Sequence, residues 1–584
     1  MRYWELVKVY QKLESTSKRL EKTYFIADLL EKTPLEELPI VILLLQGRVY
    51  PVWDERKLGV AGRLVLKSIT TASGINSGEV EEIWKRHGDL GLASEEIIGR
   101  KKQNTLFSQD LTLVKIFENL KKLADLEGEG TVDRKIKLIA ELLTSAKPDE
   151  AKYIVRSVLE ELRIGVGEGS IRDAIVWAFL YPVKYSKEEN DINLSEEARE
   201  EYNKNVEALQ EAYDITNDFS EVAVLAKEKG IEGLKNVSLE TGKPIKVMLY
   251  QKAKDIEDAF LIVGKPAALE YKYDGFRLQI HRKKDKISFF TRRLENVTKQ
   301  FPDIVKIVRE NIKSEDYVID AEVIGIDPKT GRWLAFQNIS QRIKRKYDII
   351  QMTKDIPVMV NCFDAVMIEG ENIIKRPFSE RRELLQKVTN EMPGKLQLAK
   401  EIITDNAEEA ERFYNEALDK GNEGIMAKSL DKPYKPGSRV GYGVKVKPVM
   451  ETLDLVIVGA EWGEGKRANW LSSFTIACVD KDGNFLEVGK VGTGIKEKDE
   501  EGISFSQLTE MIRPLIISEK GKEARIKPAI VIEVNYEEIQ KSPNYSSGFA
   551  LRFPRLVRLR EDRNPEEISS LETVKQYYKE QRGK

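Results

Sequence analysis

The apolar residues in the first 240 positions recur at the three- and four-residue intervals of amphipathic helices. Leu6, Val9, Tyr10 and Leu13 form one such face near the start of the chain. Similar runs occupy residues 20–30, 133–145, 150–162, 170–181 and 205–213. Glycine and proline mark the joins between these runs. We therefore expect residues 1–240 to form an all-helical domain.

A stretch with glycine and proline at 228–245 ends this pattern, and strands dominate beyond it. Strands are expected at 267–273, 277–282, 286–291, 317–326, 356–368, 423–428 and 443–448. Helices are expected near 299–312 and 406–420. This mixture predicts an α+β domain over residues 241–449.

From Glu451 onward, short β segments alternate with glycine-rich turns. Strands are expected at 454–460, 472–480, 484–492 and 530–537. Such a pattern fits an OB-like barrel, and Asn564-Pro565 is typical of a helix start. We expect residues 450–584 to form a β-barrel OB-fold domain with a C-terminal helix, so the whole chain is expected to be a multidomain protein.

Composition supports several domains and excludes some classes of protein. A chain of 584 residues is too long for one hydrophobic core. The 95 Lys+Arg residues nearly balance the 97 Asp+Glu residues, so any binding of nucleic acid must come from local basic patches. Charged residues make up 33% of the chain, which favours a thermophilic source. Two cysteines cannot build a zinc site or a disulfide framework. No apolar run has membrane-spanning length and the start lacks a signal peptide, so we expect an intracellular, cytoplasmic, nucleoid-associated protein without a membrane partner.

Residues 270–277 read Glu-Tyr-Lys-Tyr-Asp-Gly-Phe-Arg and follow an apolar run. The run breaks at Asp274-Gly275, a strong turn pair. Strand alternation puts Glu270, Lys272 and Asp274 on one face, so an amine lies between two carboxylates. Taken alone, the stretch is equally a surface strand of mixed charge that ends in a turn.

The pattern Lys-x-Asp-Gly-x-Arg resembles the nucleotidyltransferase signature of DNA ligases, RNA ligases and mRNA-capping enzymes. In that family the lysine, here Lys272, attacks the α-phosphate of a nucleotide and carries it as a phosphoramidate. An ammonium has no lone pair, so Lys272 must first lose a proton that a free lysine holds to about pH 10.4. The neighbouring carboxylates oppose this loss. Burial, a metal or cations from elsewhere in the chain must therefore promote it.

Later segments resemble further motifs of that family in the family order. Arg277 lies just past the turn and Arg292 closes a strand; the resemblance implies that both contact the nucleotide through forked donors. Asp320 and Glu322 share one face of an apolar strand, where carboxylates need a metal or hydrogen-bond donors. Glu322 matches the family glutamate that holds the ribose or the metal.

Three more segments complete the set. Phe363 matches the aromatic residue that stacks on adenine, although a lone phenylalanine is more often a core residue. Glu423 matches the metal-side carboxylate. Arg439, Lys445 and Lys447 follow, and the two lysines share a strand face. These cations can neutralise a triphosphate and lower the pKa of the attacking amine.

The resemblance covers essentially the whole chain and is closest to archaeal ATP-dependent DNA ligases. Residues 46–61 and 161–169 are similar to parts of the helical DNA-binding domain of these ligases. In residues 161–169 a glycine loop lies beside an arginine at a helix start, where exposed backbone N–H groups can bind a phosphate. Residues 550–562 are similar to the sixth motif, whose arginines meet pyrophosphate or the DNA backbone. NAD-dependent relatives carry a four-cysteine zinc site, which this chain cannot form.

The resemblance implies that a monomer seals 5′-phosphate/3′-hydroxyl nicks in double-stranded DNA in replication, repair and recombination, through a lysine–AMP intermediate. Its cofactors would be ATP and Mg²⁺, with Mn²⁺ possible in its place. Residues 103–107 resemble a shortened sliding-clamp-binding motif, equally readable as a loop with a core phenylalanine. The expected site has Lys272 as the catalytic residue, Glu270, Arg277, Arg292, Glu322, Phe363, Arg439 and Lys445 as nucleotide-binding residues, and Glu322 and Glu423 as metal ligands. An RNA ligase or capping-type enzyme is the alternative, and a non-catalytic nick-binding scaffold is the third hypothesis.

Overall fold

The computed structural model describes residues 1–581 except 55, 101–109, 127, 129, 193, 335, 345–347, 449, 464–466 and 468. The chain divides into two compact units. One unit comprises Met1–Leu249, Gly275–Ala399 and Leu430–Val440, and the other comprises Tyr250–Asp274, Lys400–Ser429 and Gly441–Lys584. Among the described residues, no helix is both long and apolar enough to cross a membrane.

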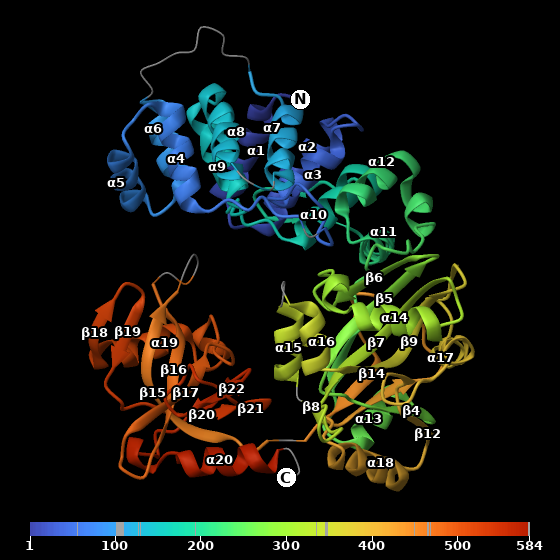
Figure 1. Ribbon diagram of the computed structural model, residues 1–584. Coiled ribbons are helices and arrows are strands. Elements are labelled where there is room, and N and C mark those ends of the chain that lie inside the picture. Colours follow the sequence, from blue (N-terminus) through green and yellow to red (C-terminus); the bar gives the residue numbers. More distant parts are fainter. Residues whose placement is uncertain are drawn as a thin grey trace. The chain divides into compact units, whose positions relative to one another are not determined.

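Helices make up most of the first 235 residues (Figure 1). Their apolar faces share one core that extends from Tyr3 to Leu234. The helices are α1 (Tyr3–Ser15), α2 (Arg19–Lys32), α3 (Leu38–Leu45), α4 (Gly62–Ser73), α5 (Ser77–His87), α6 (Leu90–Gly99), α7 (Leu113–Asp125), α8 (Thr131–Ser145), α9 (Pro148–Val158), α10 (Glu168–Ile175) with its π-helical extension (Val176–Leu180), α11 (Glu196–Thr216) and α12 (Phe219–Lys235). A short pair of strands, β1 (Tyr185–Ser186) and β2 (Asp191–Ile192), departs from the expected all-helical pattern.

Two loops in this helical part have the same build. Each reads basic–aliphatic–Gly–Val–small, at 57–61 and at 163–167, and leads directly into α4 or α10. The loop glycines, Gly59 and Gly165, have φ angles of +59° and +63°, a left-handed conformation that glycine adopts without strain. The sequence therefore repeats one turn-and-helix unit at two distant places.

A buried lysine holds each of these loops. Lys135 of α8 donates to the carbonyl oxygens of Leu58 (2.6 Å) and Gly59 (3.3 Å). Lys22 of α2 donates in the same way to those of Ile164 (2.5 Å) and Gly165 (3.0 Å). Both lysines are only 7% exposed, so their ammonium groups depend on these carbonyl partners. We call each arrangement a lysine clamp.

The first unit also contains a seven-stranded sheet in the order β10-β9-β7-β5-β6, with β8 paired to β7 and β11 to β9. Its strands are β5 (Phe276–Lys283), β6 (Lys286–Thr291), β7 (Asp316–Ile326), β8 (Trp333–Leu334), β9 (Val358–Ile368), β10 (Glu371–Asn372) and β11 (Leu396–Leu398). Helices α14 (Pro302–Asn311) and α17 (Phe378–Val388) pack on one face and form a second core with it. Two further helices are α15 (Phe336–Lys344) and α16 (Ile349–Asp355).

Strand β9 carries an extra residue relative to β7 at two places, and one of these residues is Phe363. Ala321 lies opposite Cys362 and Asp320 lies opposite Asp364, so Phe363 forms a β-bulge. Cys362 belongs to the apolar core, whereas Asp364 shares the polar face with Asp320. A bulge changes the direction of a side chain and is common beside active sites. The two-residue alternation read from the sequence therefore does not continue across Phe363.

A five-stranded sheet has the order β12-β4-β13-β14-β3. Its strands are β3 (Leu249–Lys252), β4 (Ala267–Tyr271), β12 (Glu401–Thr404), β13 (Ile425–Ser429) and β14 (Arg439–Val446); α13 (Ile256–Val263) and α18 (Ala407–Asp419) accompany it. The strand predicted at 267–273 is shorter than expected, because β4 ends at Tyr271. Lys272 and Asp274 therefore lie beyond the strand, and the argument from alternation does not apply to them.

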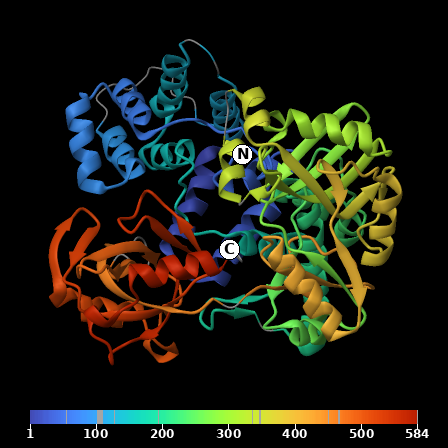
Figure 2. The same ribbon diagram turned by 60° about the horizontal axis from the view of Figure 1, so that its bottom comes forward.

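Strands dominate the C-terminal part of the chain (Figure 1 and Figure 2). They are β15 (Leu453–Trp462), β16 (Leu471–Val479), β17 (Phe485–Val491), β18 (Ile516–Lys520), β19 (Glu523–Ile526), β20 (Val531–Asn535), β21 (Glu538–Lys541), β22 (Phe549–Arg552) and β23 (Arg555–Leu559), with helices α19 (Phe505–Ile512) and α20 (Leu571–Glu580). Strand β15 pairs with β16, β19 and β20 along its length. A third core, from Leu453 to Val574, lies wholly inside this part.

Candidate active site

Lys272 is held beside Glu423 by the main chain. The Lys272 N–H donates to the Gly424 carbonyl (2.9 Å), and the Glu423 N–H donates to the Lys272 carbonyl (2.9 Å). Lys272 Nζ lies 2.5 Å from Glu423 Oε2, and Lys447 Nζ lies 2.6 Å from the same oxygen. The three side chains are 21%, 21% and 18% exposed. Two amines thus share one carboxylate oxygen at a partly shielded position.

The charge of Glu423 follows from this geometry. Burial raises the pKa of a carboxyl group, but the nearby Lys272 and Lys447 ammonium groups outweigh that effect and lower the pKa of Glu423 to about 2. The Glu423 carboxylate is therefore ionised across the physiological pH range. Gly424 makes the close approach of the main chains possible, because its φ is +133° and a Cβ there would lie 2.1 Å from the Val446 carbonyl oxygen.

Strand alternation predicted that Glu270 and Asp274 lie on either side of the Lys272 amine, but Glu270 forms a close ion pair with another lysine. Its Oε2 lies 2.5 Å from Lys428 Nζ, and both side chains are 3% exposed. Glu270 is on β4, opposite Met426 of β13, while Lys428 lies two residues further along β13. Glu270 thus forms an ion pair with Lys428, a residue that does not belong to the expected site.

A second group lies on the polar face of the seven-stranded sheet, in the other unit. Arg277 Nη2 lies 2.5 Å from Asp320 Oδ2 and donates to the Tyr434 hydroxyl at 2.8 Å. The Arg277 guanidinium carbon is 5.1 Å from the centroid of the Phe363 ring, within the range of a cation–π contact. The predicted residues Arg277 and Phe363 therefore come together, with Asp320 fully buried beneath them.

Strand register adds Glu322 to this second group. Glu322 lies opposite Arg277 of β5 on one side and opposite Asn361 of β9 on the other. Residues directly opposite one another share a face, so Glu322 and Asp320 lie on the same face as Arg277. The prediction that the two carboxylates of this strand share a face is confirmed.

The remaining predicted residues have less defined surroundings. Arg292 is exposed in the turn after β6, and Arg439 is exposed as the first residue of β14. Lys445 is half-buried on β14, opposite Met426. Residues 103–107 lie outside the described residues.

The expected site omits Tyr434, and Lys447 enters the expectation only as a cation near Lys272. Tyr434 stands between two prolines in Lys432-Pro433-Tyr434-Lys435-Pro436, a weak signal for a fixed aromatic residue in a loop. Lys447 is expected among these cations from its Lys-x-Lys spacing with Lys445, and the structure places its Nζ 2.6 Å from Glu423 Oε2.

The side chains that the structure describes do not by themselves supply enough ligands for a metal ion, so a bound nucleotide would have to supply the others. Among the described residues, no cluster of three or more His, Cys, Asp or Glu side chains could hold a metal by itself. Magnesium in nucleotide sites is commonly held by one or two carboxylates together with phosphate oxygens. The ionised Glu423 of one unit and the half-buried Glu322 of the other could each supply one such carboxylate.

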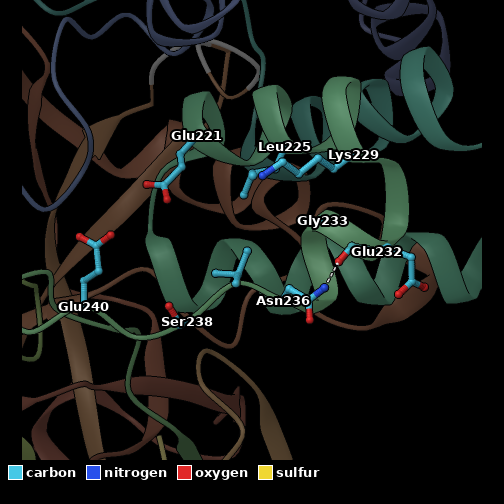
Figure 3. A pocket seen from close by; sticks show the side chains of 9 residues that line it. Glu221, Leu225, Lys229, Glu232, Gly233, Asn236, Ser238 and Glu240 are labelled. Carbon is cyan, nitrogen blue, oxygen red and sulfur yellow. Dashed lines mark hydrogen bonds between the residues drawn. The ribbon is translucent and has the colours of Figure 1, made fainter. Parts of the chain in front are cut away.

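A pocket lies along α12 and the segment that follows this helix, in the first unit. Figure 3 shows it lined by Glu221, Leu225, Lys229, Glu232, Gly233, Asn236, Val237, Ser238 and Glu240. The helix kinks at Gly230, whose φ is +58° and ψ is −151°. The Asn236 side chain donates to the Glu232 carbonyl at 2.9 Å. None of the residues that line this pocket is a predicted site residue.

Three family models match separate parts of the chain. The ATP dependent DNA ligase domain matches residues 247–447, the DNA ligase N terminus matches 2–176, and the ATP dependent DNA ligase C terminal region matches 467–563. A DNA ligase of Nanoarchaeum equitans is 50% identical over 100% of this chain and 99% of its own length. A DNA ligase of Thermococcus fumicolans is 44% identical over 99% of this chain and 98% of its own length.

Solved structures agree at the level of the fold. The structure named Pmar-Lig_Pre. has a TM-score of 0.53 at 16% identity, and covers 95% of this chain and 99% of that chain. The full-length relatives carry the assignment, because they are all named DNA ligases and match from end to end. The expected multidomain architecture is confirmed, and the RNA-ligase alternative is not favoured. The chain belongs to the family of ATP-dependent DNA ligases.

Proposed function

We propose that this DNA ligase seals 5′-phosphate/3′-hydroxyl nicks in duplex DNA through AMP carried on Lys272. The observation that carries the proposal is the pair of short contacts from Lys272 and Lys447 to one oxygen of Glu423. They provide a nucleophile, a proton acceptor and a phosphate-binding cation in one place.

In the first step, the Lys272 nitrogen attacks the α-phosphorus of ATP, and the bond to pyrophosphate breaks. The amine must first give up a proton, and Glu423 is the acceptor within 2.5 Å. While two lysines contact it, Glu423 is a weak base. When phosphate oxygens draw Lys447 away, one of the two cations that lower the Glu423 pKa is lost, and the carboxylate becomes a better proton acceptor.

In the second step, AMP passes from Lys272 to the 5′-phosphate of the nick, which frees the amine. In the third step, the 3′-hydroxyl attacks that phosphorus, the phosphodiester bond forms and AMP leaves. Both are in-line displacements at phosphorus, for which positioning and neutralisation of charge supply most of the catalysis.

Nucleotide binding is assigned to residues of both groups. Phe363 offers its ring to adenine, and Arg277 and Glu322 lie beside it on the sheet face that would meet the nucleoside. We also propose that Glu270, Arg292, Arg439 and Lys445 bind the nucleotide, because each of them lies in one of the segments that resemble the family motifs. Mg²⁺, or Mn²⁺ in its place, would be held by Glu322 and Glu423 with the phosphates, and would supply charge neutralisation.

Three domains are proposed, at 1–240, 241–449 and 450–584. Separate apolar cores at Tyr3–Leu234, Phe276–Leu396 and Leu453–Val574 support this division. The helical domain is proposed to bind DNA through the loops 57–61 and 163–167, and the C-terminal strands to form an OB-fold barrel. We further propose that the protein acts as a monomer in the cytoplasm and that residues 103–107 bind a sliding clamp.

Labelling with ATP that carries a radioactive α-phosphate tests the central step. The full-length protein should become labelled, and Lys272→Ala should abolish the label together with nick sealing. Lys400→Ala is the matched control, because Lys400 pairs with Glu416 outside the candidate site. Persistent labelling of Lys272→Ala at another residue would refute the scheme. Competition between nicked DNA and nicked RNA duplexes tests the choice of substrate.

A further inference from the structure

Tyr434 is central to the polar group around Arg277, although it lies 157 residues further along the chain. Its side chain is only 3% exposed. Burial raises the pKa of the Tyr434 hydroxyl well above its usual range. The group is therefore an un-ionised donor and acceptor at every working pH.

The Tyr434 hydroxyl makes three hydrogen bonds. It accepts from Arg277 Nη2 (2.8 Å) and from the backbone N–H of Met248 (3.2 Å), and it donates to Asp320 Oδ2 (2.8 Å). A phenol can donate once and accept twice, so its full capacity is used. The oxygen is thus held from three separate parts of the chain.

These bonds also fix the orientation of the Arg277 guanidinium. Its Nη2 contacts both Tyr434 and Asp320, and its Nη1 donates to the Met248 carbonyl at 3.3 Å. A planar guanidinium anchored at both terminal nitrogens cannot turn about its long axis. The guanidinium carbon therefore stays near the Phe363 ring, 5.1 Å from the ring centroid.

We propose that Tyr434 is a positioning residue that orients the Arg277 guanidinium, and with it the Phe363 ring, for ATP. The inference rests on the proposed nucleotide-binding roles of Arg277 and Phe363. Without the hydroxyl, the ion pair between Arg277 and Asp320 remains, but one of its two anchors at Nη2 is lost. The guanidinium then samples orientations that do not fit the nucleotide, and binding weakens because the site is no longer preorganised.

ATP affinity in the Lys272→Ala background separates binding from chemistry. The full-length protein would be titrated calorimetrically with Mg²⁺–ATP after adding Tyr434→Phe, Arg277→Lys or both. Tyr434→Phe should weaken ATP binding about tenfold, as expected for losing one hydrogen bond to a charged group. Tyr317→Phe is the matched control, since Tyr317 is a buried tyrosine on the core side of the same sheet, and it should leave ATP affinity unchanged.

The double variant tests whether Tyr434 acts through Arg277. In the Arg277→Lys background, Tyr434→Phe should have little further effect, because coupled residues are not additive. Unchanged affinity in folded Tyr434→Phe, or fully additive effects, would overturn the proposal. If Arg277→Lys alone leaves ATP affinity unchanged, the proposed role of Arg277 fails as well. Should Tyr434→Phe not fold, as judged by circular dichroism, Asp320→Asn weakens the same bonds at constant size and carries the same expectation.

Discussion

At the scale of single residues, Glu423 places a negative charge beside the attacking amine, because its Oε2 lies 2.5 Å from Lys272 Nζ. Its carboxylate has a lowered pKa because two ammonium groups contact one of its oxygens. A carboxyl group with a lower pKa in the folded than in the unfolded state stabilises the fold when it is ionised. The site residue proposed to accept a proton is therefore also a structural ion-pair partner.

We expect the stability contributed by Glu423 to depend on pH. It should be complete above the ordinary carboxyl pKa of 4.5 and be lost as the pH falls toward 2, where the folded group is protonated. Glu423→Gln should lower the melting temperature at pH 7 by the equivalent of about 1–3 kcal/mol, because it leaves two ammonium groups without their counter-charge. Melting curves of both proteins at pH 7 and pH 3 check this. A difference that is equally large at pH 3 would contradict it.

At the scale of elements, the two lysine clamps set the shape of the loops proposed to meet DNA. Each clamp connects a glycine turn with a helix that is far from it in the sequence. Lys22 binds the turn at 163–167, and Lys135 binds the turn at 57–61. Burial lowers the pKa of Lys135, which shows the electrostatic penalty of keeping this ammonium inside. The carbonyl oxygens offset that penalty only if the loop keeps its turn.

Lys22→Met should weaken the binding of nicked duplex DNA by about threefold to thirtyfold, because it keeps the apolar stem and removes the donor. Because Lys22 is buried, it is not expected to contact a phosphate, and the slope of log affinity against log salt should not change. Arg163→Ala is the comparison variant: the Arg163 side chain is exposed, and losing a phosphate contact should reduce that slope by about 1. Fluorescence anisotropy over a salt series measures both. An equal fall in slope for Lys22→Met would mean that the lysine contacts DNA itself.

At the scale of the whole molecule, the cores are separate and the third one is self-contained. Every buried residue of that core falls between Leu453 and Val574. We expect a fragment of residues 450–584 to fold alone and to unfold cooperatively on heating, as a domain with its own core does. Calorimetry of the fragment checks this; a fragment with no cooperative transition would show that its core depends on the rest of the chain.

The sequence predicted most of the elements and the order of the motifs, because both leave local signals. Periodicity located α1, α2 and α8 to α11 but not α3 to α7 or α12, and it located the strands around Lys272 within a few residues at the ends. The Phe363 bulge was not predictable, since one extra residue on one strand shows only when its partner is known. The partners of Lys22 and Tyr434 were equally hidden, because they lie 142 and 157 residues away.

The lysine clamps allow amino-acid substitutions at the exposed positions of the two loops. The clamp bonds end on main-chain oxygens, so these bonds do not depend on the identity of the side chains that the turn presents outward. Exposed positions such as Ala61 and Gly167 can therefore be replaced while the turn keeps its path. A chain built this way can vary the chemistry of a contact surface by substitution alone, with no insertion and no rebuilding of the helices beneath.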